Sequence, residues 1–223
     1  MKILALEFSS TQRSVAVVEA NPTTAPAILS EIVDGDGRMT NALPLVDESL
    51  REAGVEREQI DSLAIGIGPG SYTGIRSAIA LAQGWQLARE IKLLAIGSVE
   101  CIAEQARLLG LRGRMHIVID AQRNEFYVAT YEVGDTSVQN RTSLTLATLA
   151  DVQTRLVGSE PIVGPEVKRW FPLGQIVFPR AGVLGQLAAY RNDFVCGEKI
   201  EPIYLRETSF VKAPPPRVIP EIS

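Results

Sequence analysis

The order of strand-like and helix-like segments in the first 110 residues restricts the fold more than any other feature of the chain. Three short runs of β-type composition come first and lie close together, which favours an antiparallel meander. Helix-type segments then alternate with two further apolar runs, which favours parallel strands joined by right-handed crossovers. The predicted strands cover residues 2–7, 14–18, 28–33, 62–67 and 93–97, and the predicted helices cover 41–53, 73–89 and 98–109.

The glycine-rich stretch GIGPGSYTGIRSA, residues 66–78, joins a predicted strand to a predicted helix. It is not a P-loop, because the chain contains no Gly-Lys pair. Gly68 and Gly70 begin a dinucleotide-binding fingerprint, but Thr73 stands where its third glycine belongs. A tight strand-to-helix turn is the favoured reading, and an anion at the free amides of the helix N-terminus is the alternative.

Each residue of this turn has a predicted part in it. The two glycines and a proline shape the backbone, and Ser71 or Thr73 caps the helix. Arg76 is predicted to bridge to a partner or to a phosphate. The predicted turn and helix N-terminus comprise Gly68, Pro69, Gly70, Ser71, Thr73, Gly74 and Arg76.

The second half of the chain opens like the first. Apolar runs at 116–122 and 126–133 predict a hairpin, and helical spacing follows at 147–156 and 182–192. The first strand of each half ends in an acidic residue, Glu7 or Asp120, which supports an internal duplication. We predict an N-terminal domain over 1–108 and a smaller C-terminal domain over 109–223 with a proline-rich tail.

Composition excludes several classes of protein. Lysine and arginine number 22 against 26 acidic residues, so the basic excess of a typical nucleic-acid binder is absent. The two cysteines form no C-x-x-C pair, which excludes a zinc ribbon. No apolar run reaches membrane-spanning length and the N-terminus lacks a signal-peptide pattern, so we expect a cytoplasmic protein.

The chain has a single histidine, His116, at the start of a predicted strand. One histidine cannot form an H-x-x-x-H or H-E-x-x-H metal site. No G-x-S-x-G elbow accompanies it, so a Ser-His-Asp triad is not expected either. We expect a structural or surface histidine, no metal site and no catalytic residues.

The element order resembles the ribonuclease-H-like core of the actin, hexokinase and Hsp70 (ASKHA) group. Two acidic strand ends occupy the places of that group's phosphate loops. The first loop carries Glu7, Ser9, Ser10 and Thr11, and the second begins at Asp120. Arg123 and Glu125 stand in the second loop where small residues would let backbone amides meet a phosphate. We expect both nucleotide loops to be degenerate.

Two helices flank the glycine turn: the first carries apolar residues, and the second carries apolar and small residues on more than one face. Such a helix serves close packing on a sheet or an interface with a partner, and both uses stay open. The predicted partner-interface residues are Leu43, Val46, Leu50, Ala78, Ala82 and Trp85.

Four segments together resemble the bacterial TsaB (YeaZ) family. GIGPGSYTGIR resembles its hallmark G-x-G-P-G-S-[FY]-T-G-[VIL]-R, LPLVDESLREAG its first helix, DAQRNEFYVATY its D-A-R-x-x-E-[VI]-Y segment, and IEPIYLRE its E-P-x-Y-[LV]-R. The opening strand pair, ILALEFSSTQRSVAVV, resembles that of the family but has Glu7 and Phe8 in place of Asp-Thr. The matches run in order along nearly the whole chain.

The resemblance implies an α/β, actin-like fold of two lobes, each with a mixed sheet flanked by helices. It also implies a non-catalytic subunit that pairs with the paralogue TsaD and the ATPase TsaE to form threonylcarbamoyladenosine on tRNA beside the anticodon. ATP and a metal would be used by the partner subunits and not by this chain alone, and tRNA would be contacted mainly through the complex. The first two helices would form the dimerisation surface, with a homodimer as an open alternative when the partner is absent.

Two other functions stay open from the sequence. A stand-alone small-molecule kinase of actin-like fold would need working nucleotide loops, against which Arg123 and Glu125 argue. A glycoprotease-type peptidase would need a histidine pair that this chain lacks.

Overall fold

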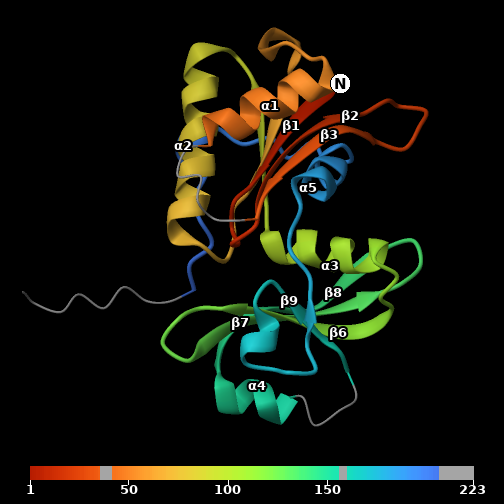
Figure 1. Cartoon of the computed structure of the whole chain (residues 1–223), viewed down its shortest axis with the longest axis vertical. Coiled ribbons are helices and arrows are strands. Elements are labelled where there is room, and N and C mark those ends of the chain that lie inside the picture. Colours follow the sequence, from red (N-terminus) through yellow and green to blue (C-terminus); the bar gives the residue numbers. More distant parts are fainter. Residues whose placement is uncertain (36–41, 156–159, 206–223) are drawn as a thin grey trace, which may run out of the picture.

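The computed structural model describes residues 1–35, 42–155 and 160–205. Within this part of the chain the strands form two five-stranded mixed sheets, stacked along the long axis of the molecule (Figure 1). The strand orders are β3-β2-β1-β4-β5 and β10-β9-β6-β7-β8. The predicted α/β fold with two mixed sheets flanked by helices is confirmed.

The first sheet is built around a central strand that is buried on both faces. β1 (Lys2–Glu7) pairs antiparallel with β2 (Arg13–Glu19), which pairs antiparallel with β3 (Ala27–Asp34). On its other side β1 pairs parallel with β4 (Ser62–Gly66), which pairs parallel with β5 (Lys92–Ile96). Continuous apolar sequence in β1 matches its burial, since a strand covered on both faces has no polar side.

Helices cover both faces of the first sheet. α1 (Leu43–Ala53) and α2 (Tyr72–Ala88) pack on one face, where their apolar side chains share a core with the sheet. α1 ends at Gly54, whose φ of 62° is left-handed. The short 3₁₀ helix η1 (Arg57–Gln59) follows it. The predicted helix over 41–53 begins at Leu43, and Asn41 lies outside the described residues.

The second sheet repeats this arrangement. β6 (Gly113–Asp120), β7 (Glu125–Val133) and β8 (Val138–Thr148) are antiparallel, and β6 pairs parallel with β9 (Ile162–Gly164), which pairs parallel with β10 (Gln175–Ile176). α3 (Ser98–Leu108) covers the face toward the first sheet (Figure 1). α4 (Leu149–Arg155) and the 3₁₀ helix η2 (Val167–Arg169) lie on the other face.

The chain returns to the first lobe after the second sheet. α5 (Ala181–Ala188) packs on the face of the first sheet opposite α1 and α2. Val195 then forms a β-bridge with Leu93 of β5. η3 (Gly197–Lys199) leads to Ile200, which lies in the core under α1 and α2. Gly185 allows the close approach, because a Cβ there would overlap Val18. The predicted division at residue 109 therefore does not separate the two cores: the segment from α5 onward belongs with the first sheet.

Two expectations from the sequence concern the C-terminal tail and membrane-spanning segments. The predicted proline-rich tail lies outside the described residues, which end at 205. No helix in the described ranges is long and apolar enough to cross a membrane.

Candidate functional site

The glycine turn closes over the end of the first hairpin. Gly70 and Gly74 lie against the β1–β2 turn, where a Cβ on either would overlap a backbone carbonyl oxygen, that of Ser9 or of Phe8. The Ser71 N–H donates to the Ser9 carbonyl oxygen at 2.7 Å. The glycines are thus required for close packing of this turn against the first hairpin.

The helix cap is provided by the first of the two predicted candidates. Ser71 Oγ accepts a hydrogen bond from the Gly74 N–H at 3.3 Å, whereas Thr73 is exposed and accepts at its carbonyl from the Ser77 hydroxyl. Before the cap, the Gly68–Pro69 peptide bond is cis and Gly68 has a φ of 89°. The left-handed φ of Gly68 is one that favours glycine.

Glu7, at the end of β1, lies fully buried behind this turn. Its Oε1 accepts from the Ser9 N–H at 2.8 Å, and its Oε2 accepts from the Ser98 hydroxyl at 3.0 Å. Ser98 Oγ also accepts from the Gly68 N–H at 3.2 Å, and the Ser98 N–H donates to the Gly68 carbonyl at 2.7 Å. One carboxylate therefore joins β1, the glycine turn and the start of α3.

Burial sets the protonation of this carboxyl group. It raises the pKa of Glu7 above its usual range, because a low-dielectric surrounding disfavours the charged form, and hydrogen bonds from Ser9 and Ser98 oppose that rise. The neighbouring Cys101 thiol, which donates to the Arg180 carbonyl at 3.3 Å, has its pKa raised well above the ordinary value by burial and by the charge of Glu7. This junction is closed to the surface.

The rest of the first predicted nucleotide loop forms a hydrogen bond between its own residues. Ser9 and Ser10 are buried, and the Ser10 hydroxyl donates to the Gln12 carbonyl at 3.0 Å. Thr11 is exposed at the tip. The structure thus brings Glu7 and Ser9 together and encloses them instead of presenting them to a ligand.

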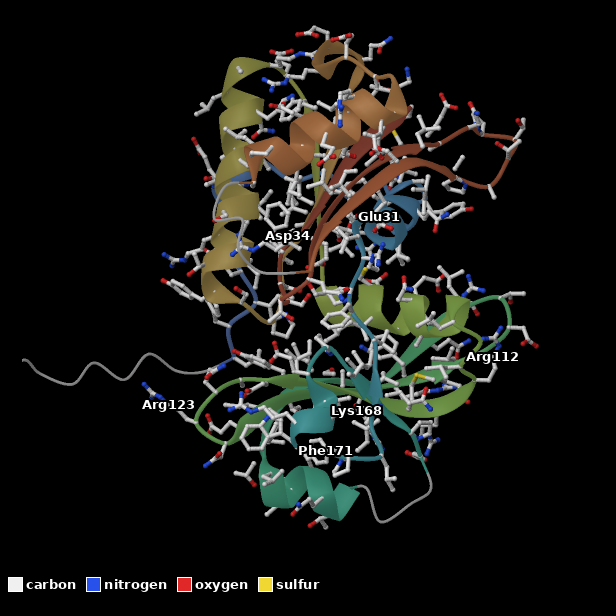
Figure 2. The ribbon with its side chains drawn as sticks, viewed as in Figure 1. Glu31, Asp34, Arg112, Arg123, Lys168 and Phe171 are labelled. Atoms are coloured by element: carbon white, nitrogen blue, oxygen red, sulfur yellow. The ribbon has the colours of Figure 1, made fainter. Side chains whose placement is uncertain are left out.

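The second predicted loop is a tight hairpin turn. Gln122, Arg123 and Asn124 all have left-handed φ values, of 65°, 59° and 61°. Asp120 accepts from the Gln122 N–H at 2.7 Å, and the Ala121 N–H donates to the Glu125 carbonyl at 2.9 Å. These amides are engaged inside the turn, while Arg123 extends into solvent at its tip (Figure 2).

The predicted interface residues divide by burial. Val46, Leu50, Ala78 and Ala82 are buried in the core of the first lobe. Leu43 is exposed and Trp85 is half-buried. The spacing of apolar residues could not separate these groups, because α1 and α2 use their most regular apolar stripes to cover the sheet.

The C-terminal segment 200–205 was not anticipated as part of the site. The Ile203 N–H donates to the Ile67 carbonyl at 2.9 Å, and the Ile203 side chain lies against Gly97. Tyr204 then stacks on Tyr72 of α2. The signal in the sequence was the IEPIYLRE match, which indicated a resemblance but no position in space.

His116 is held inside the second lobe by contacts with two neighbouring side chains. It is buried on β6, with Nδ1 at 3.0 Å from the Thr130 hydroxyl and Nε2 at 2.9 Å from a Glu160 oxygen. Within residues 1–35, 42–155 and 160–205, no three His, Cys, Asp or Glu side chains are grouped so that they could hold a metal ion.

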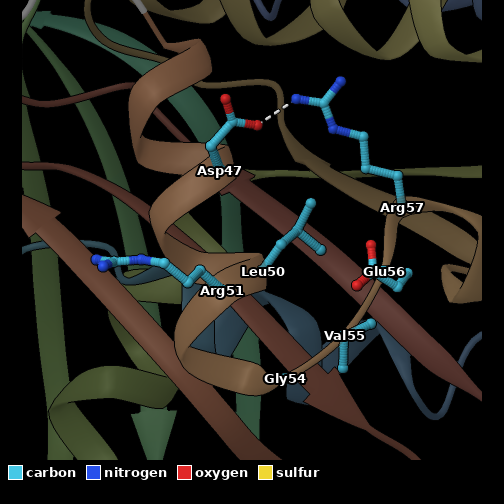
Figure 3. A pocket seen from close by; sticks show the side chains of 7 residues that line it. All are labelled: Asp47, Leu50, Arg51, Gly54, Val55, Glu56 and Arg57. Atoms are coloured by element: carbon cyan, nitrogen blue, oxygen red, sulfur yellow. Dashed lines mark hydrogen bonds and ion pairs between the residues drawn. The ribbon is translucent and has the colours of Figure 1, made fainter.

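A shallow depression of about 390 Å³ lies at the C-terminal end of α1, away from the predicted turn residues (Figure 3). An ion pair between Arg57 and Asp47 crosses one side of it. Its lining comprises Asp47, Leu50, Arg51, Gly54, Val55, Glu56 and Arg57. None of the sequence patterns indicated it.

Known proteins resemble this chain in sequence and in structure. The sequence model of the family described as "TsaD: tRNA N6-adenosine threonylcarbamoyltransferase" matches residues 38–209. The protein named tRNA threonylcarbamoyladenosine biosynthesis protein TsaB from Escherichia coli K12 is 26% identical over 92% of this chain and 95% of its own length. The Haemophilus influenzae protein of that name is 32% identical, over 57% of this chain and 52% of its own length.

A solved structure titled YeaZ from Pseudomonas aeruginosa superposes with a TM-score of 0.76 at 25% identity, covering 92% of this chain and 99% of that one. The match includes both lobes, so it extends to the arrangement of the two sheets. The chain therefore belongs to the TsaD family that the sequence model describes and, within it, to the TsaB (YeaZ) proteins.

Proposed function

We propose that this chain is a non-catalytic subunit in the biosynthesis of threonylcarbamoyladenosine on tRNA, and that it pairs with a TsaD-type subunit and a TsaE-type ATPase. Its relatives carry the name of this biosynthesis. In this proposal the partner subunits bind ATP and the metal, and this chain binds neither alone.

The enclosed Glu7 is the observation that carries the non-catalytic part. A carboxylate that binds Mg²⁺ or orients water for phosphoryl transfer has to reach the ligand. Both oxygens of Glu7 are bound inside the junction, by Ser9 and Ser98, and the side chain is fully buried. Exposing it would require the glycine turn to separate from the β1–β2 turn.

The second loop favours the same proposal over a small-molecule kinase. A phosphate loop offers backbone N–H groups to its ligand. The N–H groups of Ala121, Gln122 and Glu125 bond within the hairpin turn itself. A kinase would need both loops to be rebuilt.

The exposed part of α1 and α2 is the proposed surface for the TsaD-type subunit. Both helices lie on the same outer face of the first sheet (Figure 1). Leu87, near the end of α2, is 90% exposed, and Leu43 is exposed at the start of α1. We call Leu43 and Leu87 the outer helix surface.

The test is purification of this chain together with the TsaD-type protein of its own genome. Leu87→Glu places a charge on the outer helix surface and should weaken the complex at least tenfold if this surface is buried in it. Leu173→Glu is the matched control, because Leu173 is a 98% exposed leucine of the second lobe. A gene-deletion strain complemented with each variant should lose threonylcarbamoyladenosine from its tRNA only with Leu87→Glu.

Two results would contradict the proposal. One is that no complex forms with the wild-type chain at micromolar concentrations. The other is that the isolated chain binds MgATP and transfers phosphate to a small acceptor.

A further inference from the structure

An aromatic and guanidinium cluster lies where the C-terminal segment meets the start of α2. The rings of Tyr72 and Tyr204 stack with centroids 5.4 Å apart at an interplanar angle of 28°. The guanidinium carbon of Arg76 lies 4.3 Å from the centroid of the Tyr72 ring. Tyr72 and Arg76 are one helical turn apart, whereas Tyr204 comes from the far end of the described chain.

The cluster is open to solvent although its members contact each other. Tyr72 is 54% exposed, Tyr204 is 39% exposed and Arg76 is exposed. Partial burial raises the pKa of Tyr204, and a hydrogen bond from Arg76 opposes that rise. Both rings therefore leave part of their aromatic surface accessible.

The start of α2 adds hydrogen-bond donors beside the rings. Ile75 is the first residue of this helix whose N–H bonds to a backbone carbonyl in it, that of Ser71. The amides of Tyr72 and Thr73 precede it, at the positive end of a 17-residue helix. Such an end favours an anionic group such as a phosphate.

We propose that Tyr72, Arg76 and Tyr204 form a stacking site for an unpaired base of single-stranded RNA, with the neighbouring phosphate at the N-terminus of α2. Proteins read unpaired RNA bases by stacking them on aromatic rings and on arginine planes. The inference rests on the proposed function, in which the substrate is a tRNA modified beside the unpaired bases of its anticodon loop.

The charge of the chain fixes how such binding should depend on salt. The net charge is −4, so attraction over the whole surface does not favour RNA. One phosphate neutralised on a single strand by a cation such as Arg76 gives a slope of about −0.7 in a plot of log affinity against log salt concentration. We expect a slope near that value, in contrast to the steep dependence of a polybasic binder.

The experiment measures binding of the full-length chain to a labelled ten-nucleotide RNA of alternating A and C by fluorescence anisotropy. Tyr204→Ala should weaken binding roughly tenfold, since one stacked base contributes about 1–3 kcal/mol. Tyr204→Phe keeps the ring and should stay within about twofold of the wild type. Arg76→Lys keeps the charge but loses the planar group, so we expect an intermediate loss.

A matched control separates a stacking site from a general effect of losing a tyrosine. Tyr190 is 77% exposed and lies beyond the end of α5, so Tyr190→Ala should leave the affinity unchanged. Circular dichroism of every variant checks that the chain is folded. Inorganic polyphosphate, which has no bases, should compete poorly for the site.

Three results would overturn the inference. These are no binding of the RNA by the wild-type chain, equal binding by wild type and Tyr204→Ala, and loss of the TsaD-type partner by Tyr204→Ala with RNA binding retained. The last would assign the cluster to a protein contact. The inference and the proposed function fail separately, because the partner complex and the RNA affinity are measured in different assays.

Discussion

The two sheets share one strand order, but their parallel halves differ in size. In the first lobe β4 and β5 have five residues each and lie next to the 17-residue helix α2. In the second lobe β9 and β10 have three and two residues, and a 3₁₀ turn connects them. The antiparallel halves are complete in both. Shortening of one half is therefore compatible with the fold as long as the central strand keeps neighbours on both sides.

The loops at the two equivalent strand ends differ in how far they are buried. Behind the first, Glu7 is sealed by the glycine turn and Ser98. At the second, Asp120 is partly exposed and the turn ends in the solvated Arg123. The two equivalent positions thus carry one closed and one open loop, and the following predictions test the differences between the two lobes.

The largest effect should come from the core of the smaller lobe. Phe126 is fully buried and makes edge contacts with Trp170 and Phe171. Phe126→Ala should lower the free energy of unfolding by about 4 kcal/mol, because it removes a large side chain and leaves a cavity. Urea denaturation followed by circular dichroism measures the loss.

The equivalent test of the first lobe is Phe8→Ala, since Phe8 is also fully buried. Similar losses in one common transition would show that the lobes unfold together, as expected from α3 and α5, which contact each other between the sheets. Phe194→Ala, at a partly exposed phenylalanine, is the control and should cost less. A loss below about 1 kcal/mol for Phe126→Ala would contradict the packing described.

The closed glycine turn should give the next largest effect. A Cβ at Gly74 would overlap the Phe8 carbonyl oxygen, so Gly74→Ala should destabilise the protein by about 3 kcal/mol. Gly84 is the matched control in the same helix, because no atom lies within 4 Å of a Cβ built there. Gly84→Ala should raise stability by up to about 1 kcal/mol through helix propensity. Thermal unfolding of the two variants should therefore shift in opposite directions.

Sequence patterns predicted the first lobe better than the second. Every α-helix and strand of residues 2–109 was identified, because apolar periodicity and glycine or serine boundaries mark them clearly, whereas the 3₁₀ helix η1 was not. β8 was missed because most of the strand is exposed and its sequence, VQNRTSLTLAT, begins with a largely polar run that shows no apolar alternation. β9 and β10 are too short to show a period. α5 was recognised as a helix, but its apolar residues on all sides do not specify which sheet it covers.

The site was predicted as single residues and not as an arrangement. Glu7 was identified from its place at a strand end, but its partner Ser98 lies 91 residues away. The stack of Tyr72 and Tyr204 spans a still longer separation. Such contacts follow from the topology, because the carboxyl ends of β1, β4 and β5 meet at one edge of the sheet, and local spacing carries no signal for them.

The pH dependence of stability should reveal the closed junction. The folded-state pKa of Glu7 is raised, so the folded protein holds this proton more tightly than the unfolded chain does. The contribution is fully present below the unfolded pKa and is lost as pH rises through the folded pKa. Glu7→Gln removes that loss, so the variant should gain stability relative to wild type as pH increases through this range.

Chemical denaturation between pH 4 and pH 8 measures this difference. Asp120→Asn, at the equivalent strand end of the second lobe, is the control for removing a carboxylate whose side chain is not enclosed. A difference between Glu7→Gln and wild type that stays constant over the whole range would mean that the Glu7 carboxyl is solvated, which would contradict a closed junction.

The smallest effect concerns the ion pair that ties the returning chain to the first sheet. Arg180, just before α5, forms two hydrogen bonds with Glu31 of β3, at 3.1 Å and 2.8 Å, and both side chains are partly shielded from water. Arg180→Ala should cost about 1 kcal/mol, whereas Arg51→Ala, which breaks an exposed pair with Glu48, should stay within about 0.5 kcal/mol. The Gly182 N–H still bonds to Glu31 in the Arg180 variant, so the carboxylate keeps one partner.

A double-mutant cycle with Glu31→Gln isolates the pair from the packing of α5. A coupling energy as low as that of the exposed pair would mean that α5 is held on the first sheet by apolar contact alone, and that the bidentate contact adds orientation without adding stability.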